Sequence, residues 1–190
     1  HAPVPGAGMI GCGLLAADSA SWKVEGGAEG SGDFGVPANG MCATESVDEE
    51  RRALRNRDVV VLITGAWEAR RYQGSGGTVI APETPTMRAA LSDALERRID
   101  RILGLGVDHI VLPEWTCGDT DWSPRQRSGS YRAWFNGILR EAAAARPEVT
   151  TVPAGSGLCT DGQMTAAHRA VRTAGAHWGS PEATRLFWQW

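Results

Sequence analysis

The hydrophobic residues of this chain fall into short continuous runs separated by longer segments with helical spacing. Two runs stand out, at residues 58–63 and 109–112. Continuous apolar runs of this length are typical of strands that are buried in a parallel sheet, and the first of them is expected to be buried on both faces. Residues 149–152, Val-Thr-Thr-Val, are predicted to form a third strand.

Helical spacing predicts a helix between each pair of these strands. Thr84 offers an N-cap with Pro85 at the first helical position, and Gly104 or Gly106 ends this first helix. Pro147 stops the second helix. The apolar face consists of Met87, Leu91, Leu95, Ile99 and Ile102 in the first helix, and of Tyr131, Trp134, Phe135, Ile138, Leu139 and Ala142 in the second.

A third helix is predicted at the end of the chain, with Ser180 as its N-cap and Pro181 at its first position. Polar, glycine-rich loops are expected at 73–85 and 113–129, and residues 20–39 carry no clear pattern. Repeated strand–helix–strand units of this length predict an α/β fold with a parallel sheet between helices on both faces, which makes three layers. The apolar side of the third helix consists of Leu186, Phe187 and Trp190.

Composition narrows the class of protein. The 190 residues are 42% hydrophobic, so residues 1–190 are long enough for a single domain with a sizeable core. A formal net charge of −3, without any block of Lys or Arg, argues against nucleic acid as a partner. No apolar run approaches the ~20 residues that span a bilayer. The first residues show neither an initiator methionine nor a basic signal-peptide segment, so we expect an excised piece of a longer protein.

The four cysteines, Cys12, Cys42, Cys117 and Cys159, indicate an oxidising compartment. Their number is even, and no CxxC or Cys/His spacing predicts a metal site. Of the three possible pairings, the spacing favours Cys12–Cys42 with Cys117–Cys159. Each bond would then stabilise the fold by roughly 3–4 kcal/mol. The alternative is four buried free thiols in a cytosolic protein.

Candidate functional residues lie directly after the ends of the predicted strands. Parallel sheets bind ligands at the carboxyl ends of their strands, which here carry residues 65–68, 114–117 and 153–156. His177, on the glycine-rich loop before the third helix, can reach the same edge. We therefore expect a functional site at this edge of the sheet.

Six segments of the chain carry a resemblance to a known family: residues 10–14, 58–68, 111–113 with Cys117, 132–139, 149–159 and 171–190. In their order and spacing they resemble the C-terminal extracytoplasmic SGNH domain of membrane acyltransferase-3 proteins, which O-acetylate cell-surface glycans. The resemblance implies an SGNH hydrolase, flavodoxin-like fold that here lacks its first strand. It also implies a location at the cell surface or in the periplasm, a transmembrane acyltransferase domain as partner in the full-length protein, and no cofactor. The disulfide pairing suits that family.

The resemblance implies transfer or hydrolysis of an acyl group by a nucleophilic serine, with His177 as the general base. Main-chain oxyanion donors would come from the glycine of the second family block, which matches Gly11 or Gly13. The turn from Gly65 to Trp67 replaces the usual Gly-x-Asn of the third block. Trp67 has no carboxamide, so any donor there is a backbone or indole N–H.

The chain departs from the family pattern at two places. Where the family reads Arg-x-Asp-Gly-x-His, residues 172–177 carry Ala174 in place of the acid. The family's Gly-Asp-Ser turn lies upstream of the block that matches residues 11–13, which places the nucleophile before the first residue of this chain. As an alternative, residues 14–16 form a short strand that leads to Ala17-Asp18-Ser19, and Ser19 is the nucleophile. The other interpretation of Asp18 and Ser19 is ordinary turn chemistry.

Other carboxylates could replace the missing acid beside His177. Asp161, Glu68 or a backbone carbonyl could fix the histidine tautomer, and Glu68 and Glu114 could equally bind a glycan. The alternative for His177 is a structural role at the helix entry. We expect His109 to be structural and His168 to be solvated.

Tryptophans at the predicted edge are candidates for stacking on sugars, with core packing as the alternative; they are Trp67, Trp115, Trp122 and Trp178. Two functions remain open from the sequence. The first is an ester hydrolase or O-acyltransferase domain that acts on acyl esters of cell-surface glycans. The second is a non-catalytic glycan-binding module of the same fold. The retained His177 favours the first, and Ala174 favours the second.

Overall fold

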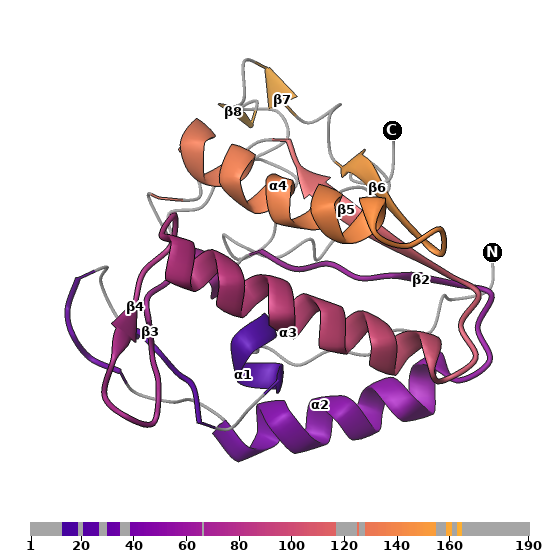
Figure 1. The fold of residues 1–190 in the computed structure, drawn as a ribbon, viewed down its shortest axis with the longest axis horizontal. Coiled ribbons are helices and arrows are strands. Elements are labelled where there is room, and N and C mark those ends of the chain that lie inside the picture. Colours follow the sequence, from indigo (N-terminus) through magenta and orange to yellow (C-terminus); the bar gives the residue numbers. More distant parts are fainter. Residues whose placement is uncertain are drawn as a thin grey trace.

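A computed structural model of the chain shows an α/β arrangement with a central parallel sheet (Figure 1). The residues that it describes are 13–18, 21–26, 30–34, 39–65, 67–116, 125, 128–154, 159–160 and 163–164.

The three predicted strands form the central sheet. They are β2 (Val59–Val61), β5 (His109–Trp115) and β6 (Val149–Ala154), in the order β2-β5-β6. Both pairings are parallel. The α/β class and the parallel sheet predicted from the apolar runs are therefore confirmed.

The two predicted crossover helices are also present. They are α3 (Pro85–Leu103) between β2 and β5, and α4 (Gly129–Ala144) between β5 and β6. The Thr84 hydroxyl accepts a hydrogen bond from the N–H of Met87 at 3.2 Å, which confirms the predicted N-cap.

Within the described ranges, none of the helices combines the length and the hydropathy that a membrane crossing requires.

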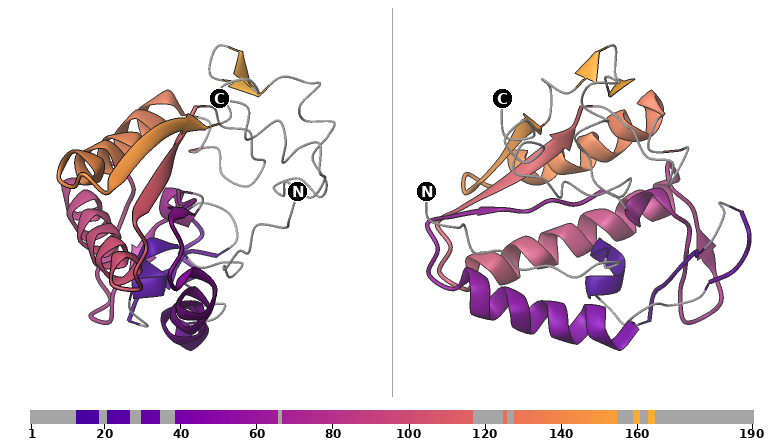
Figure 2. Two further views of the ribbon diagram at one scale, coloured as in Figure 1. Left: turned by 90° about the vertical axis from the view of Figure 1, so that its right-hand side faces the viewer. Right: turned by 180° about the vertical axis from the view of Figure 1, so that it is seen from behind.

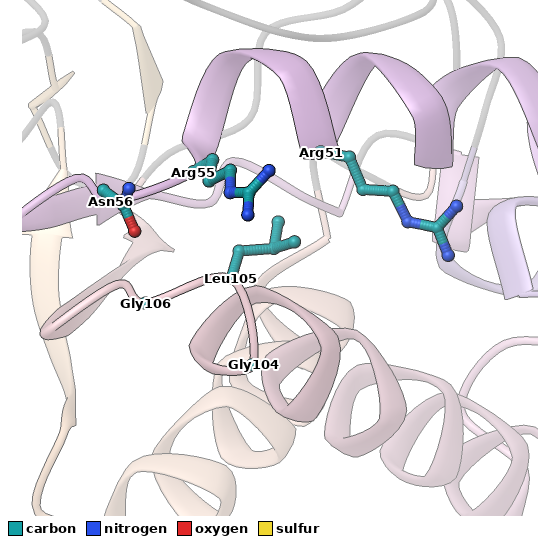
Figure 3. A pocket seen from close by; sticks show the side chains of 6 residues that line it. All are labelled: Arg51, Arg55, Asn56, Gly104, Leu105 and Gly106. Carbon is teal, nitrogen blue, oxygen red and sulfur yellow. The ribbon is translucent and has the colours of Figure 1, made fainter.

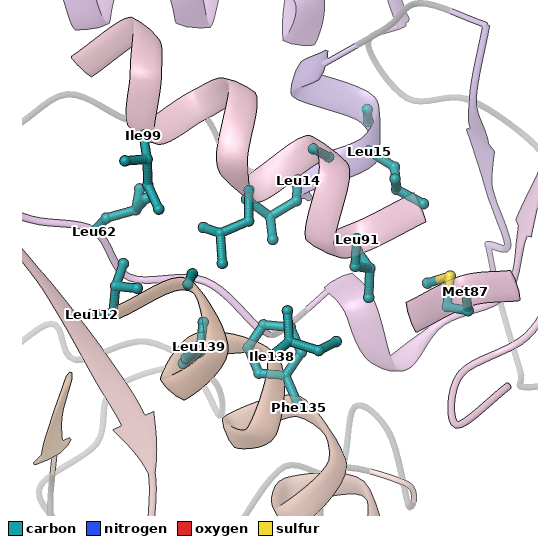
Figure 4. Close-up of a cluster of buried hydrophobic side chains, with 14 of the residues drawn as sticks. Leu14, Leu15, Leu62, Met87, Leu91, Ile99, Leu112, Phe135, Ile138 and Leu139 are labelled. Atoms are coloured by element: carbon teal, nitrogen blue, oxygen red, sulfur yellow. The ribbon is translucent and has the colours of Figure 1, made fainter. Parts of the chain in front are cut away.

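The core lies where the sheet packs against these helices (Figure 4). Leu62 and Leu112 point from the sheet toward Ile99 of α3 and Leu139 of α4, and all four are at most 6% exposed. Leu14, in the short helix α1 (Leu14–Asp18), enters the same core. Helix α1 is thus anchored against α3.

One face of the sheet is not covered by the described helices. The sheet order runs in one direction and crossovers are right-handed, so α3 and α4 must lie on the same face (Figure 2). On the other face, Val59, Val61 and Ile63 are 57%, 38% and 56% exposed. The prediction that residues 58–63 are buried on both faces is therefore wrong for the described part of the chain.

Several elements lie where the sequence pattern predicts no helix or strand. The predicted loop 73–85 contains a hairpin, β3 (Tyr72–Gln73) with β4 (Val79–Ile80), and β1 (Lys23–Val24) pairs with β3. These strands are two residues long, too short to show a period of two. The long helix α2 (Asn39–Leu54) is polar on average. Further along the chain, β7 (Cys159–Thr160) pairs with β8 (Gln163–Met164).

Ion pairs join helix α2 to α3. Glu50 of α2 is 3% exposed and forms ion pairs with Arg98 and Arg101 of α3. The partners lie about 50 positions away in the sequence, so periodicity within 39–54 could not reveal them.

The β1–β3 pairing is reinforced by an ion pair between buried Glu25 and Arg71. The N–H groups of Gly30 and Gly32 also donate to this carboxylate, each at 3.1 Å. The Arg71 guanidinium holds the pKa of Glu25 at about 2, below its usual 4.5.

A folded-state pKa below the unfolded value means that the stabilisation by Glu25 is complete above pH 4.5 and is lost as the pH falls toward 2. We expect this loss to reach at most about 3 kcal/mol, because one pKa unit corresponds to about 1.4 kcal/mol. Urea unfolding of the wild type and of Glu25→Gln between pH 6 and pH 2.5 measures it. The two stabilities should converge as the pH falls, and a constant difference between them would contradict the assignment.

Candidate functional site

The start of α1, at Gly13 and Leu14 (the Gly13 turn), meets the segment after β2 that contains Gly65 (the Gly65 turn) at the carboxyl end of that strand. The side chain that joins them is Glu68, in the short 3₁₀ helix η1 (Trp67–Ala69). Its Oε1 accepts a hydrogen bond from the N–H of Leu14 at 2.5 Å, and its Oε2 accepts one from the N–H of Gly65 at 2.8 Å. Glu68 is 1% exposed, and this burial raises its pKa. The carboxyl group is thus enclosed and used by the main chain.

Gly65 is held from the other side by β5 and α4. The Tyr131 hydroxyl donates to the carbonyl of Gly65 at 2.9 Å, and the Trp115 indole N–H donates to the carbonyl of Thr64 at 2.6 Å. Gly65 has a φ of 110°, which an L side chain rarely adopts. A Cβ there would lie 2.4 Å from Trp115 Nε1. This position therefore requires glycine for its conformation and for its contacts.

Asn136 of α4 fixes the end of β5, a role that the sequence pattern does not predict. Its amide accepts from the N–H of Trp115 and donates to the carbonyl of Trp115, both at 2.9 Å. Asn136 is 7% exposed. The sequence did offer one signal for this role: Asn136 lies between Phe135 and Ile138 on the apolar face of the predicted helix, and a buried polar side chain needs hydrogen-bond partners.

Gly13 lies directly against the same cluster. A Cβ at Gly13 would lie 2.3 Å from the Tyr72 hydroxyl oxygen, 2.8 Å from Trp67 Cβ and 3.0 Å from Glu68 Oε1. The Tyr72 hydroxyl is buried and has no hydrogen-bond partner within the described residues. The turn at Gly13 thus leaves no room for a side chain.

Glu114, the other carboxylate proposed to bind a glycan, is 9% exposed and forms an ion pair with Arg140, whose Nε donates to it at 3.0 Å. Glu68 and Glu114 at the edge of the sheet are therefore both bound by groups of the protein itself.

Other predicted residues lie in the core or away from the edge. Trp67 and Trp115 are half-buried and pack against the core. His109 Nε2 lies 3.0 Å from Thr150 Oγ1, across the β5–β6 pairing at the end of the sheet opposite the site.

The structure thus brings together Gly13, Gly65, Trp67 and Glu68. The alternative strand at 14–16 is wrong, because these residues lie in α1, and the interpretation of Ser19 as a residue after a strand loses that support. Cys42 and Cys159 lie in α2 and β7, but their side chains are not described, so the disulfide pairing stays a prediction. Other predicted residues lie outside the described residues: Gly11, Cys12, Ser19, Cys117, Trp122, Asp161, His168, Ala174, His177 and Trp178.

A hollow of about 350 Å³ lies at the opposite end of the sheet (Figure 3). Asn56 and Gly106, which line it, precede β2 and β5, and the C-terminal ends of α2 and α3 meet there. The nearby Arg51 and Arg55 complement the negative ends of these helices. Within the described ranges, no group of three or more His, Cys, Asp or Glu side chains could hold a metal ion. The carboxyl edge therefore remains the candidate site.

Comparison with known proteins finds no family model, no curated protein and no solved structure that matches this chain.

Proposed function

We propose that this chain is an SGNH-type ester hydrolase or O-acyltransferase domain that acts on acyl esters, acetyl esters in particular, of cell-surface glycans. The proposed fold is the flavodoxin-like three-layer sandwich of that class. The proposed setting is extracytoplasmic, with a transmembrane acyltransferase domain as partner in the full-length protein.

The observation that carries the proposal is the contact between the Gly13 turn and the Gly65–Trp67 turn through Glu68. The resemblance expects these two segments to flank one reacting carbonyl group. They are about 50 residues apart, and they meet at the carboxyl end of β2, where ligands bind in parallel sheets. This juxtaposition is the one that the resemblance expects, and it therefore supports the proposal.

In the proposed reaction, the serine oxygen attacks the carbonyl carbon of the ester, and His177 takes the serine proton. The alcohol leaves as the tetrahedral intermediate collapses, and the histidine returns the proton to it. Water or a glycan hydroxyl then attacks the acyl-serine with the same histidine as base. Main-chain N–H groups of the two turns are the candidates to stabilise the oxyanion. The N–H of Gly65 is engaged by Glu68, so we assign Gly65 a conformational role rather than a donor role.

A glycan-binding module without catalysis is the second candidate, and one observation favours it. Ala174 replaces the family acid, and Glu68 is poorly placed to substitute for it, because its side chain is 1% exposed and each of its oxygens already accepts a main-chain N–H inside the fold. Asp161 or a backbone carbonyl would then have to orient His177.

Replacing His177 separates the two candidates. In the natural protein that contains these 190 residues, we expect His177→Ala to lower the rate of acetyl-ester hydrolysis by about 100-fold, because general base catalysis typically contributes 10²–10⁴-fold. His168→Ala, the matched control, should change the rate by less than about twofold, since the sequence predicts a solvated His168 and substitutions of solvated side chains have small effects. An equal rate for wild type and His177→Ala, or no turnover by folded wild type, would contradict the enzymatic function.

A further inference from the structure

We propose that Glu68 is a positioning residue of this site: its carboxylate fixes the Gly13 turn against the Gly65 turn, so that the main-chain N–H groups of the two turns that Glu68 does not bind keep one separation. The inference rests on the proposed function. It gives Glu68 neither of the roles that the sequence allowed, which were to bind a glycan or to orient His177.

Geometry carries this assignment. Each oxygen of Glu68 accepts from a different turn, Oε1 from the N–H of Leu14 and Oε2 from the N–H of Gly65. The side chain is 1% exposed, so a sugar hydroxyl cannot reach it without opening the core. A buried carboxylate costs free energy unless it is hydrogen-bonded, and here both hydrogen bonds go to main-chain N–H groups of the candidate site.

The two turns are anchored to different parts of the fold, which is why a link between them matters. Leu14 enters the core beside α3, whereas the carbonyl of Gly65 is held by Tyr131 of α4. Without Glu68, the Gly13 turn could shift together with α3 while the Gly65 turn stays with α4. Two donors that serve one oxyanion must stay in register, since a displacement of about 1 Å can lower a rate by about 100-fold.

The test is Glu68→Gln in the natural protein. Glutamine has one acceptor oxygen, so it can satisfy only one of the two N–H groups and presents a donor to the other. We expect kcat for acetyl-ester hydrolysis to fall by about 10–100-fold with KM changed by less than about twofold, the pattern of a lost transition-state interaction. We also expect the amide of Leu14 or of Gly65 to exchange with solvent at least about tenfold faster.

Glu50→Gln is the matched control, because Glu50 is equally buried but joins α2 to α3 away from the site. It should lower stability while leaving kcat and both amides within about twofold of wild type. If both amides stay as protected in Glu68→Gln as in wild type, the proposal is overturned. A faster exchange with unchanged kcat also overturns it, since Glu68 would then be structural only. Absence of turnover in folded wild type overturns the proposed function instead, and the exchange rates still decide whether Glu68 joins the turns.

Discussion

Gly65→Ala is expected to lower the free energy of unfolding by about 4 kcal/mol, because backbone strain and steric overlap add at this position. The φ of 110° is unfavourable for alanine. The new Cβ would also lie 2.4 Å from Trp115 Nε1 and 2.8 Å from Phe135 Cε1. Both neighbours are held in place, Trp115 by its hydrogen bond to the carbonyl of Thr64 and Phe135 by the core. Urea unfolding monitored by circular dichroism measures the loss.

Gly77→Ala separates the two contributions. Gly77 also has a positive φ, of 80°, but a Cβ there meets nothing within 4 Å. Its substitution should cost only the conformational term, about 1–2 kcal/mol. If Gly65→Ala cost no more than Gly77→Ala, the close packing of Trp115 and Phe135 against Gly65 would be refuted.

Gly13→Ala is expected to cost about 3 kcal/mol, the upper range for overpacking a well-packed core. Here the strain comes from contacts alone, chiefly with the Tyr72 hydroxyl oxygen at 2.3 Å from the new Cβ. Tyr72→Phe removes that oxygen. By itself it should be neutral or slightly stabilising, since the buried hydroxyl has no partner within the described residues.

A double-mutant cycle tests this contact directly. In the Tyr72→Phe background, Gly13→Ala should cost at least about 1 kcal/mol less than in wild type, because residues in contact show coupling energies of about 0.5–3 kcal/mol. The remaining cost reflects Trp67 Cβ, 2.8 Å away. Gly76→Ala, where a Cβ has open space, is the control for a glycine replacement as such. Strictly additive costs would show that Gly13 and Tyr72 are not in contact.

The elements that the sequence predicted correctly are those whose signals are local. The predicted strands at 58–63, 109–112 and 149–152 became the central sheet, and Thr84 caps α3 as its position before Pro85 indicates. Helix α2 could not be predicted in this way, because its contact with α3 depends on Glu50 and distant arginines. The short strands of the hairpin within 73–85 had no period to detect.

The candidate site shows the same limit. Strand-end logic placed Gly65, Trp67 and Glu68 at one edge, and the structure places Gly13, which the resemblance assigned to the same site, beside them. The burial of Glu68 and its bond to Leu14 could not be read from the sequence, because they depend on where α1 packs, 54 positions away. Exposed and buried carboxylates look alike in a sequence.

The most direct test of the proposed function is intact mass after incubation with a fluorophosphonate probe, which reacts with an activated serine. If the proposed function holds, the natural protein that contains this chain should gain one adduct, on a serine outside these 190 residues as the resemblance implies, and His177→Ala should abolish it. The 190-residue chain alone should gain none. Folded natural protein without an adduct would contradict serine-dependent acyl transfer, and an adduct on Ser19 of the chain alone would contradict the upstream nucleophile.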